Sequence, residues 1–147
     1  MDKFESVDDI LDFAIAREIE AIELYSDLLR KVEKPELRSA IKGFIKEELE
    51  HKEKLETEKA EGIVLKDEEV GNLEIAEHVK GGEARPDMSY KDLLILAMKK
   101  EAASVKLYTD LAKMTEDEKL KDTFLLLAQE ESEHKLRFEL EYDLTFF

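Results

Sequence analysis

The segment EELEHK at residues 47–52 returns as EESEHK at residues 130–135, 83 positions further along the chain. A second pair of segments keeps the same offset: EIEAIELYSDLL at residues 18–29 and EAASVKLYTDLA at residues 101–112. Two separate blocks that share one offset without a gap indicate a duplicated unit. A site on the axis between the two halves is therefore expected to take matching residues from both.

Helix-forming residues dominate the 147 positions, which include five glycines and two prolines. Apolar residues at steps of three and four predict four long helices. These helices run from about Asp8 to Val32, from about Glu36 to Glu61, from after Ser89 to about Met114, and from after Thr115 to about Tyr142. The apolar stripe of the first helix is read as Leu11, Ala14, Ile15, Ile19, Ile22, Tyr25, Leu28 and Leu29.

Capping residues support these boundaries. Three capping boxes pair a hydroxyl residue with an acid three positions later: Ser6 with Asp9, Ser89 with Asp92, and Thr115 with Glu118. Pro35 suits the first turn of the second helix, and Gly62 suits its end.

Short links join the first helix to the second and the third to the fourth, so each pair forms an antiparallel hairpin. One domain is expected over residues 1–147, with hairpins at 8–62 and 89–142, a crossover at 63–88 and a tail at 143–147. The crossover is expected to hold a short helix from Glu68 to Val79 and a Gly81-Gly82 turn. Two hairpins joined by one long crossover predict an all-α, ferritin-like four-helix bundle.

Composition excludes several classes of protein. The absence of cysteine excludes disulfide scaffolds, thiolate catalysis and thiolate-bound metal centres. A net charge of −15 argues against nucleic-acid binding, which needs clustered basic residues. No apolar run is long enough to span a membrane, and the first residues lack the features of a secretory signal. We expect a cytoplasmic protein.

Each predicted helix carries a carboxylate at a position of its apolar stripe where Leu or Ile would be expected. Glu18 and Glu101 occupy such places on the first and third helices. The second and fourth helices each carry a Glu-x-x-His pair on one face, and these pairs are Glu48 with His51 and Glu131 with His134. Four unpaired carboxylates in one core must be protonated or neutralised.

No Lys or Arg is expected in these stripes near the site. Two divalent cations would balance the four carboxylates, with both histidines as neutral ligands. The expected metal ligands are Glu18, Glu48, His51, Glu101, Glu131 and His134. One Glu from each of two helices and a Glu-x-x-His pair from each of the others is the ligand set of di-iron and di-manganese bundles. Carboxylate and imidazole ligands suit iron, with manganese as the alternative. A buried polar network without metal is the competing interpretation.

On these residues the chain resembles the rubrerythrin-like branch of the ferritin-like superfamily, over nearly its whole length. The resemblance implies that Glu48 and Glu131 bridge two metals, that Glu18 and Glu101 are terminal ligands, and that each histidine binds one metal. It also implies that Tyr25 and Tyr108 hydrogen-bond to ligand carboxylates. Their alternative role is that of buried core aromatics.

Two departures from rubrerythrins proper stand out. Ser104 occupies the place of an additional ligand glutamate, which puts fast peroxide reduction in doubt, and the four cysteines of a rubredoxin module are absent. The resemblance implies a non-haem di-iron oxidoreductase that reduces a small oxidant, peroxide or dioxygen, with electrons from a separate donor protein. A di-manganese catalase, an iron-oxidising or iron-handling protein and a non-catalytic metal-stabilised bundle are the alternatives. The absence of a visible fifth helix after Tyr142 argues against a storage cage.

Other residues have less specific expectations. Glu47 and Glu130 lie at the edge of the stripes, where they either face solvent or contact the ligands. His78 is expected at the surface. The aromatic tail from Leu140 to Phe147 is expected to pack on its own bundle or on a second subunit, and we expect a homodimer. The wall expected to keep the site dry consists of Ile15, Ile22, Phe44, Ile45, Val105, Phe124 and Leu127.

Overall fold

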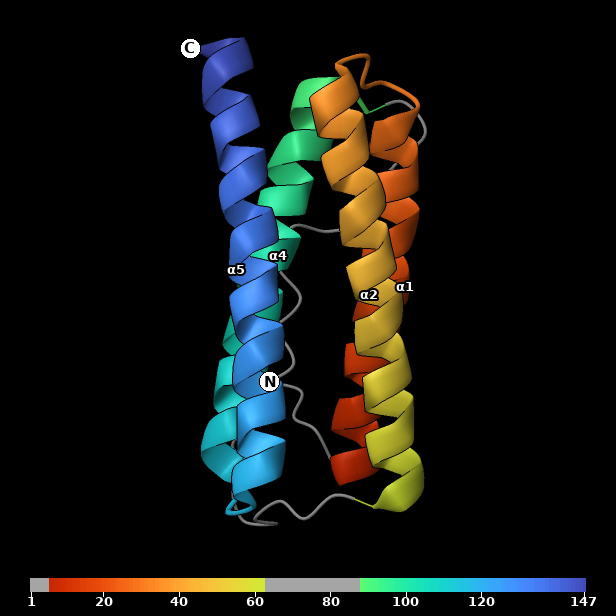
Figure 1. The fold of residues 1–147 in the computed structure, drawn as a ribbon, viewed down its shortest axis with the longest axis vertical. Coiled ribbons are helices and arrows are strands. Elements are labelled where there is room, and N and C mark those ends of the chain that lie inside the picture. Colours follow the sequence, from red (N-terminus) through yellow and green to blue (C-terminus); the bar gives the residue numbers. More distant parts are fainter. Residues whose placement is uncertain (1–5, 63–87) are drawn as a thin grey trace.

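The computed structural model describes residues 6–62 and 88–147, which form long α-helices (Figure 1). The helices are α1 (Val7–Leu29), α2 (Pro35–Glu61), α4 (Tyr90–Met114) and α5 (Glu118–Phe146). Within the two described ranges there is no strand. The all-α fold class predicted from the sequence is confirmed.

The helices form two antiparallel hairpins, α1 with α2 and α4 with α5 (Figure 1). In the figure α2 ends at the bottom and α4 begins at the top, so these two helices run in the same direction. This parallel arrangement is the ferritin-like connectivity expected for hairpins joined by one long crossover. The short helix expected at residues 68–79, the Gly81-Gly82 turn and His78 lie outside the described residues.

Two of the predicted cap residues, Ser6 and Ser89, cap their helices as expected. The hydroxyl of Ser6 accepts a hydrogen bond from the Asp9 amide at 3.0 Å, and the hydroxyl of Ser89 accepts one from Asp92 at 3.1 Å. Gly62 ends α2 with a φ of 78°, a left-handed conformation that favours glycine.

The third predicted cap is wrong, because Asp117 rather than Thr115 caps α5. The Asp117 carboxylate accepts hydrogen bonds from the amides of Lys119 and Leu120 at 3.0 and 3.2 Å, so it satisfies two of the free amides at the helix start. Thr115 instead accepts a hydrogen bond from the Asp117 amide and closes the turn after α4.

Two helix ends also differ from the prediction. α1 ends at Leu29 instead of Val32, and α5 continues to Phe146 instead of stopping at Tyr142. Neither glycine nor proline interrupts α5 near its end, and the rings of Tyr142 and Phe146 pack in a tilted arrangement with centroids 5.4 Å apart. Part of the expected tail is therefore helix.

That tail packs on the bundle only in part. The ring of Phe146 lies 6.2 Å from that of Tyr90 at the start of α4, whereas Leu144 and Phe147 are 78% and 92% exposed. None of the described helices is long and apolar enough to cross a membrane.

The apolar core consists of two clusters separated by a polar layer. On α1 one cluster ends at Ala14 and the other starts at Ala21, and on α5 the corresponding limits are Ala128 and Phe138. The layer between them is occupied by buried glutamates and histidines from α1, α2, α4 and α5. The bundle is thus built around a polar centre.

Some of the expected stripe lies outside this core. Ile19 is 40% exposed, because it follows Glu18 by one residue and therefore points about 100° away from it. Of the expected apolar wall, Phe124 and Leu127 are fully buried. The remaining members are half-buried: Ile15, Ile22, Phe44, Ile45 and Val105.

Candidate metal centre

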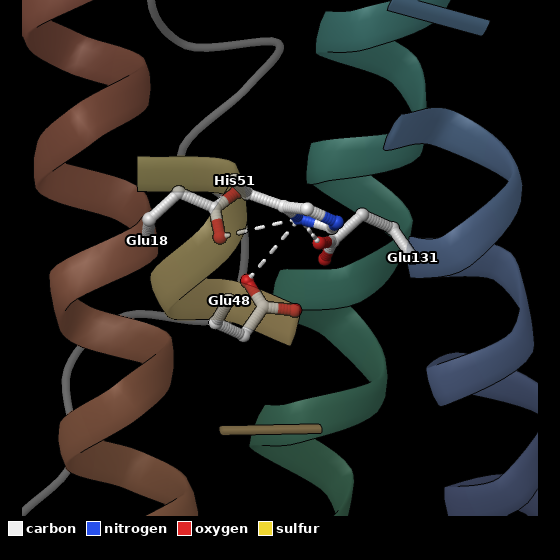
Figure 2. A group of neighbouring side chains, drawn as sticks. All are labelled: Glu18, Glu48, His51 and Glu131. Carbon is white, nitrogen blue, oxygen red and sulfur yellow. Dashed lines mark ion pairs between the residues drawn. The ribbon is translucent and has the colours of Figure 1, made fainter. Parts of the chain in front are cut away.

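The six side chains predicted as metal ligands come together in the polar layer. α1 contributes Glu18, α2 contributes Glu48 and His51, α4 contributes Glu101, and α5 contributes Glu131 and His134. All six are at most 1% exposed. Figure 2 shows four of these side chains pointing toward one another between the helices.

The six residues form two groups of four that share two members. Glu18 and His51 belong to one group, Glu101 and His134 belong to the other, and Glu48 and Glu131 belong to both. In each group, one potential ligand atom per residue lies within 4.8 Å of the others. Two sites that share two carboxylates can hold two cations side by side.

Both histidines present the Nδ1 atom to this cluster. His51 Nδ1 lies 2.8 Å from Glu131 Oε1 and 3.6 Å from Glu18 Oε2. His134 Nδ1 lies 2.9 Å from Glu48 Oε1 and 3.9 Å from Glu101 Oε2. The two halves of the chain therefore use the same ring nitrogen, as a duplicated site requires.

Several inward-facing atoms of this cluster are buried and close together, but their contacts do not have hydrogen-bond geometry, so these atoms lack a hydrogen-bond partner among the described residues. They are Glu18 Oε2, both carboxylate oxygens of Glu48, His51 Nδ1, Glu101 Oε2, Glu131 Oε1 and His134 Nδ1. Buried polar atoms normally have partners, so a concentration of unpartnered ones indicates that a ligand belongs there. Oxygen and imidazole donors around a shared centre fit a pair of divalent cations.

The sequence profile of the rubrerythrin family matches residues 9–142. The chain belongs to the rubrerythrin family. A similar solved structure is that of the hypothetical protein Pfu-1136390-001 from Pyrococcus furiosus, with a TM-score of 0.74 and 28% sequence identity. The match covers 97% of this chain and 94% of that chain. No curated protein matches the sequence.

The resemblance to the rubrerythrin-like branch is therefore confirmed. The family belongs to the ferritin-like superfamily, and its members usually hold a di-iron centre. The two groups of potential ligands in this chain fit a pair of metal ions. The absence of cysteine means that this sequence contains no rubredoxin module. Ser104 is partly buried one turn after Glu101, and neither group of four depends on it.

The two tyrosines of this rubrerythrin-family chain have different surroundings. The Tyr108 hydroxyl donates a hydrogen bond to Glu18 Oε1. Burial and the negative charge of Glu18 raise the pKa of Tyr108, so its hydroxyl keeps the donated proton. The Tyr25 hydroxyl is equally buried, but it has no hydrogen-bond partner among the described residues, and its ring packs against Phe138 with centroids 5.2 Å apart.

Two basic residues are buried beside the expected stripes, next in sequence to ligand glutamates. Arg17 and Lys100 are buried on α1 and α4, and both contact Glu20 Oε2, at 3.1 and 3.0 Å. Each immediately precedes a ligand glutamate, and their positions differ by the same offset of 83. The shared offset is the feature of the sequence that could have identified Arg17 and Lys100 as an equivalent pair. One half-exposed glutamate pairs with both basic groups, and two positive charges are too few to neutralise four ligand carboxylates.

Neighbouring charges perturb the ligands strongly. Burial, reinforced by the charge of Glu131, raises the pKa values of Glu48 and Glu101 well above the usual range. Burial opposes ionisation of Glu131, but contacts with Glu101, His51 and Glu48 outweigh it and lower the pKa to about 2. Burial also opposes the charge on His51, yet Glu131 and Glu18 raise its pKa to about 10. Protons and cations are thus expected to compete for the same atoms.

Proposed function

We propose that this rubrerythrin-family protein is a non-haem di-iron oxidoreductase that reduces peroxide or dioxygen with electrons from a separate donor protein. The observation that supports it most strongly is the pair of buried four-residue groups that share Glu48 and Glu131. With all four glutamates ionised, two divalent cations bring the charge of the cluster to zero. The attraction between the cations and the carboxylates offsets the cost of burying these charges.

The ligand assignment follows from the two groups. Glu18 and His51 would hold one metal, and Glu101 and His134 would hold the other. Glu48 and Glu131 would contact both. A bound iron pair supplies two ferrous/ferric couples, which match the two electrons needed to convert one hydrogen peroxide and two protons into two waters.

The protein supplies the dry and ordered surroundings of this centre. Phe124 and Leu127 are fully buried on one side of the polar layer, and the Phe44 ring lies 4.1 Å from the His134 ring, centroid to centroid. These groups exclude water from the ligand atoms. The Tyr108 hydroxyl holds the Glu18 carboxylate in place and keeps a proton at the edge of the site.

A separate electron donor is part of the proposal because the chain has no cysteine with which to hold a second redox centre of the rubredoxin type. The donor would have to transfer one electron for each iron. Catalytic turnover of the oxidant is then expected only when such a protein, or a chemical reductant in its place, is present.

Metal analysis after expression with both iron and manganese available tests the proposal first. About two iron ions per chain in the wild type, lost in Glu48→Ala and Glu131→Ala but kept in the exposed control Glu50→Ala, would support it. Hydrogen peroxide should then reoxidise the reduced protein at a rate above that of free ferrous iron. Two manganese ions per chain would instead favour a catalase. No bound metal in the wild type would overturn the proposal.

A further inference from the structure

Two glutamates next to the shared ligands contact the outer nitrogen of each histidine. Glu47 Oε2 lies 2.8 Å from His134 Nε2, and Glu130 Oε2 lies 3.1 Å from His51 Nε2. We call Glu47 and Glu130 the outer carboxylates. Each one reaches across the bundle, because Glu47 is on α2 and His134 is on α5, while Glu130 is on α5 and His51 is on α2.

These contacts determine which ring nitrogen faces the metal site. A carboxylate can only accept a hydrogen bond at neutral pH, so the Nε2 atom of each histidine must be the donor. A neutral imidazole with its hydrogen on Nε2 has its lone pair on Nδ1. In both histidines Nδ1 is the atom that faces the cluster, without a hydrogen-bond partner among the described residues.

The outer carboxylates are neither metal ligands nor ordinary surface residues. They contact the far side of each ring and belong to neither group of four. Their side chains are 38% and 22% exposed. Glu50 and Glu133, three residues after Glu47 and Glu130 on the same helices, are exposed. The sequence repeat therefore provides matched pairs of glutamates with and without a histidine contact.

We propose that Glu47 and Glu130 are positioning residues that fix the tautomer and orientation of the two metal-binding histidines in a crossed manner. The glutamate on α2 controls the metal held by His134, and the glutamate on α5 controls the metal held by His51. The inference rests on the proposed two-metal site. Partners of this kind orient a ligand imidazole and raise its basicity, and their removal typically weakens metal binding by roughly 10–100-fold.

The crossing separates this role from a local disturbance. Glu47 is adjacent to Glu48, which belongs to both groups, so damage transmitted along α2 would weaken both metals. An effect transmitted through the imidazole would weaken only the metal bound by His134. The same reasoning applies to Glu130, Glu131 and His51.

Cobalt(II) is a suitable probe, because it binds carboxylate and imidazole ligands and its visible spectrum reports on each bound ion. We expect Glu47→Ala and Glu130→Ala each to weaken one of two cobalt ions by about 10–100-fold. Glu47→Gln and Glu130→Gln keep a hydrogen-bond acceptor and should lose less. The controls Glu50→Ala and Glu133→Ala should titrate like the wild type. Helical circular dichroism of every variant checks that the bundle remains folded.

A double-mutant cycle then identifies the crossed partner. In a His134→Ala background the metal of that half is already weakened, so Glu47→Ala should add little, whereas Glu130→Ala should still weaken the remaining ion. Proton resonances of the imidazole N–H groups in the cobalt-loaded protein give an independent readout. Glu47→Ala should shift the His134 signal and speed its exchange with water, and it should leave the His51 signal unchanged.

The outcomes distinguish the two proposals. If the wild type binds two cobalt ions and the Glu47 and Glu130 variants behave like the controls, the positioning role is wrong and the metal site stands. Equal weakening of both ions by Glu47→Ala would also overturn the crossed role. Failure of the wild type to bind cobalt would overturn the metal site and, with it, this inference.

Discussion

Metal binding to this protein should release protons. In the metal-free cluster, His51 has a pKa of about 10, and burial raises the pKa values of Glu48 and Glu101. At pH 7.5, fewer than about one in a hundred His51 rings would be neutral. A metal ligand must be deprotonated, so His51 should give up about one proton, and the raised pKa values of Glu48 and Glu101 favour further release.

The released protons set the pH dependence of metal affinity. Each proton released makes the apparent affinity rise about tenfold per pH unit, which corresponds to about 1.4 kcal/mol. Between pH 6.5 and 7.5 we therefore expect an increase of about tenfold from His51 alone, and a larger one if Glu48 and Glu101 also lose protons.

Calorimetric titration with zinc in two buffers of different ionisation enthalpy counts these protons directly. Glu50→Ala is the matched control, because its side chain is exposed and its loss should leave the count unchanged. Two zinc ions bound without proton release, or with an affinity independent of pH, would refute the assignment of protons to His51 and the buried glutamates.

Three further predictions concern stability. The raised pKa values of Glu48, Glu101 and His51 contribute stability at low pH that is lost as pH rises. The melting temperature of the metal-free protein should therefore fall from pH 5 to pH 9. Bound metal should reduce that fall. Thermal melts of both forms across this range check it. Tyr108→Phe should destabilise the metal-free protein by about 1–3 kcal/mol in urea titrations, because it removes a buried hydrogen bond to Glu18. Tyr25→Phe should have little effect, and equal losses would contradict the assignment. Glu141 is buried, but hydrogen bonds from Tyr90, Lys34 and Thr145 outweigh this and lower its pKa. Its contribution is present above pH 4.5 and is lost as pH falls. Glu141→Gln should therefore destabilise the protein at pH 7 and much less near pH 3, as measured by urea titration at both pH values.

Much of the fold could be predicted because its determinants are local. Ser6, Ser89 and Gly62 mark helix ends through contacts within one turn of the chain. The prediction failed at Asp117 and Thr115, where two residues could both cap the helix and only the tertiary path of the turn decides between them. It also failed for Ile19, which was assigned to the buried stripe but is exposed. Steps of three and four along a helix can include a residue at the edge of the stripe that points away from the core.

The convergence of the six inner residues could be predicted because two signals coincided. A carboxylate in an apolar stripe is unusual, and the offset of 83 gave each one a counterpart, as for Glu48 and Glu131. The contacts of Glu47 and Glu130 could not be derived, because they depend on how closely α2 approaches α5. The sequence pattern allowed these two glutamates either to face solvent or to contact the ligands. In the structure they contact the histidines.

The duplicated sequence nevertheless produces two unequal halves. Tyr108 donates a hydrogen bond to Glu18, but the matching Tyr25 has no hydrogen-bond partner within the described ranges. Glu20 pairs with both Arg17 and Lys100, but the matching position 103 is alanine, so this carboxylate has no counterpart in the second half. The ligands Glu18 and Glu101 therefore experience different fields although they occupy equivalent positions. The two metals would be held by the same types of ligand. Any difference in their affinities would therefore come from the different surroundings of the two sites.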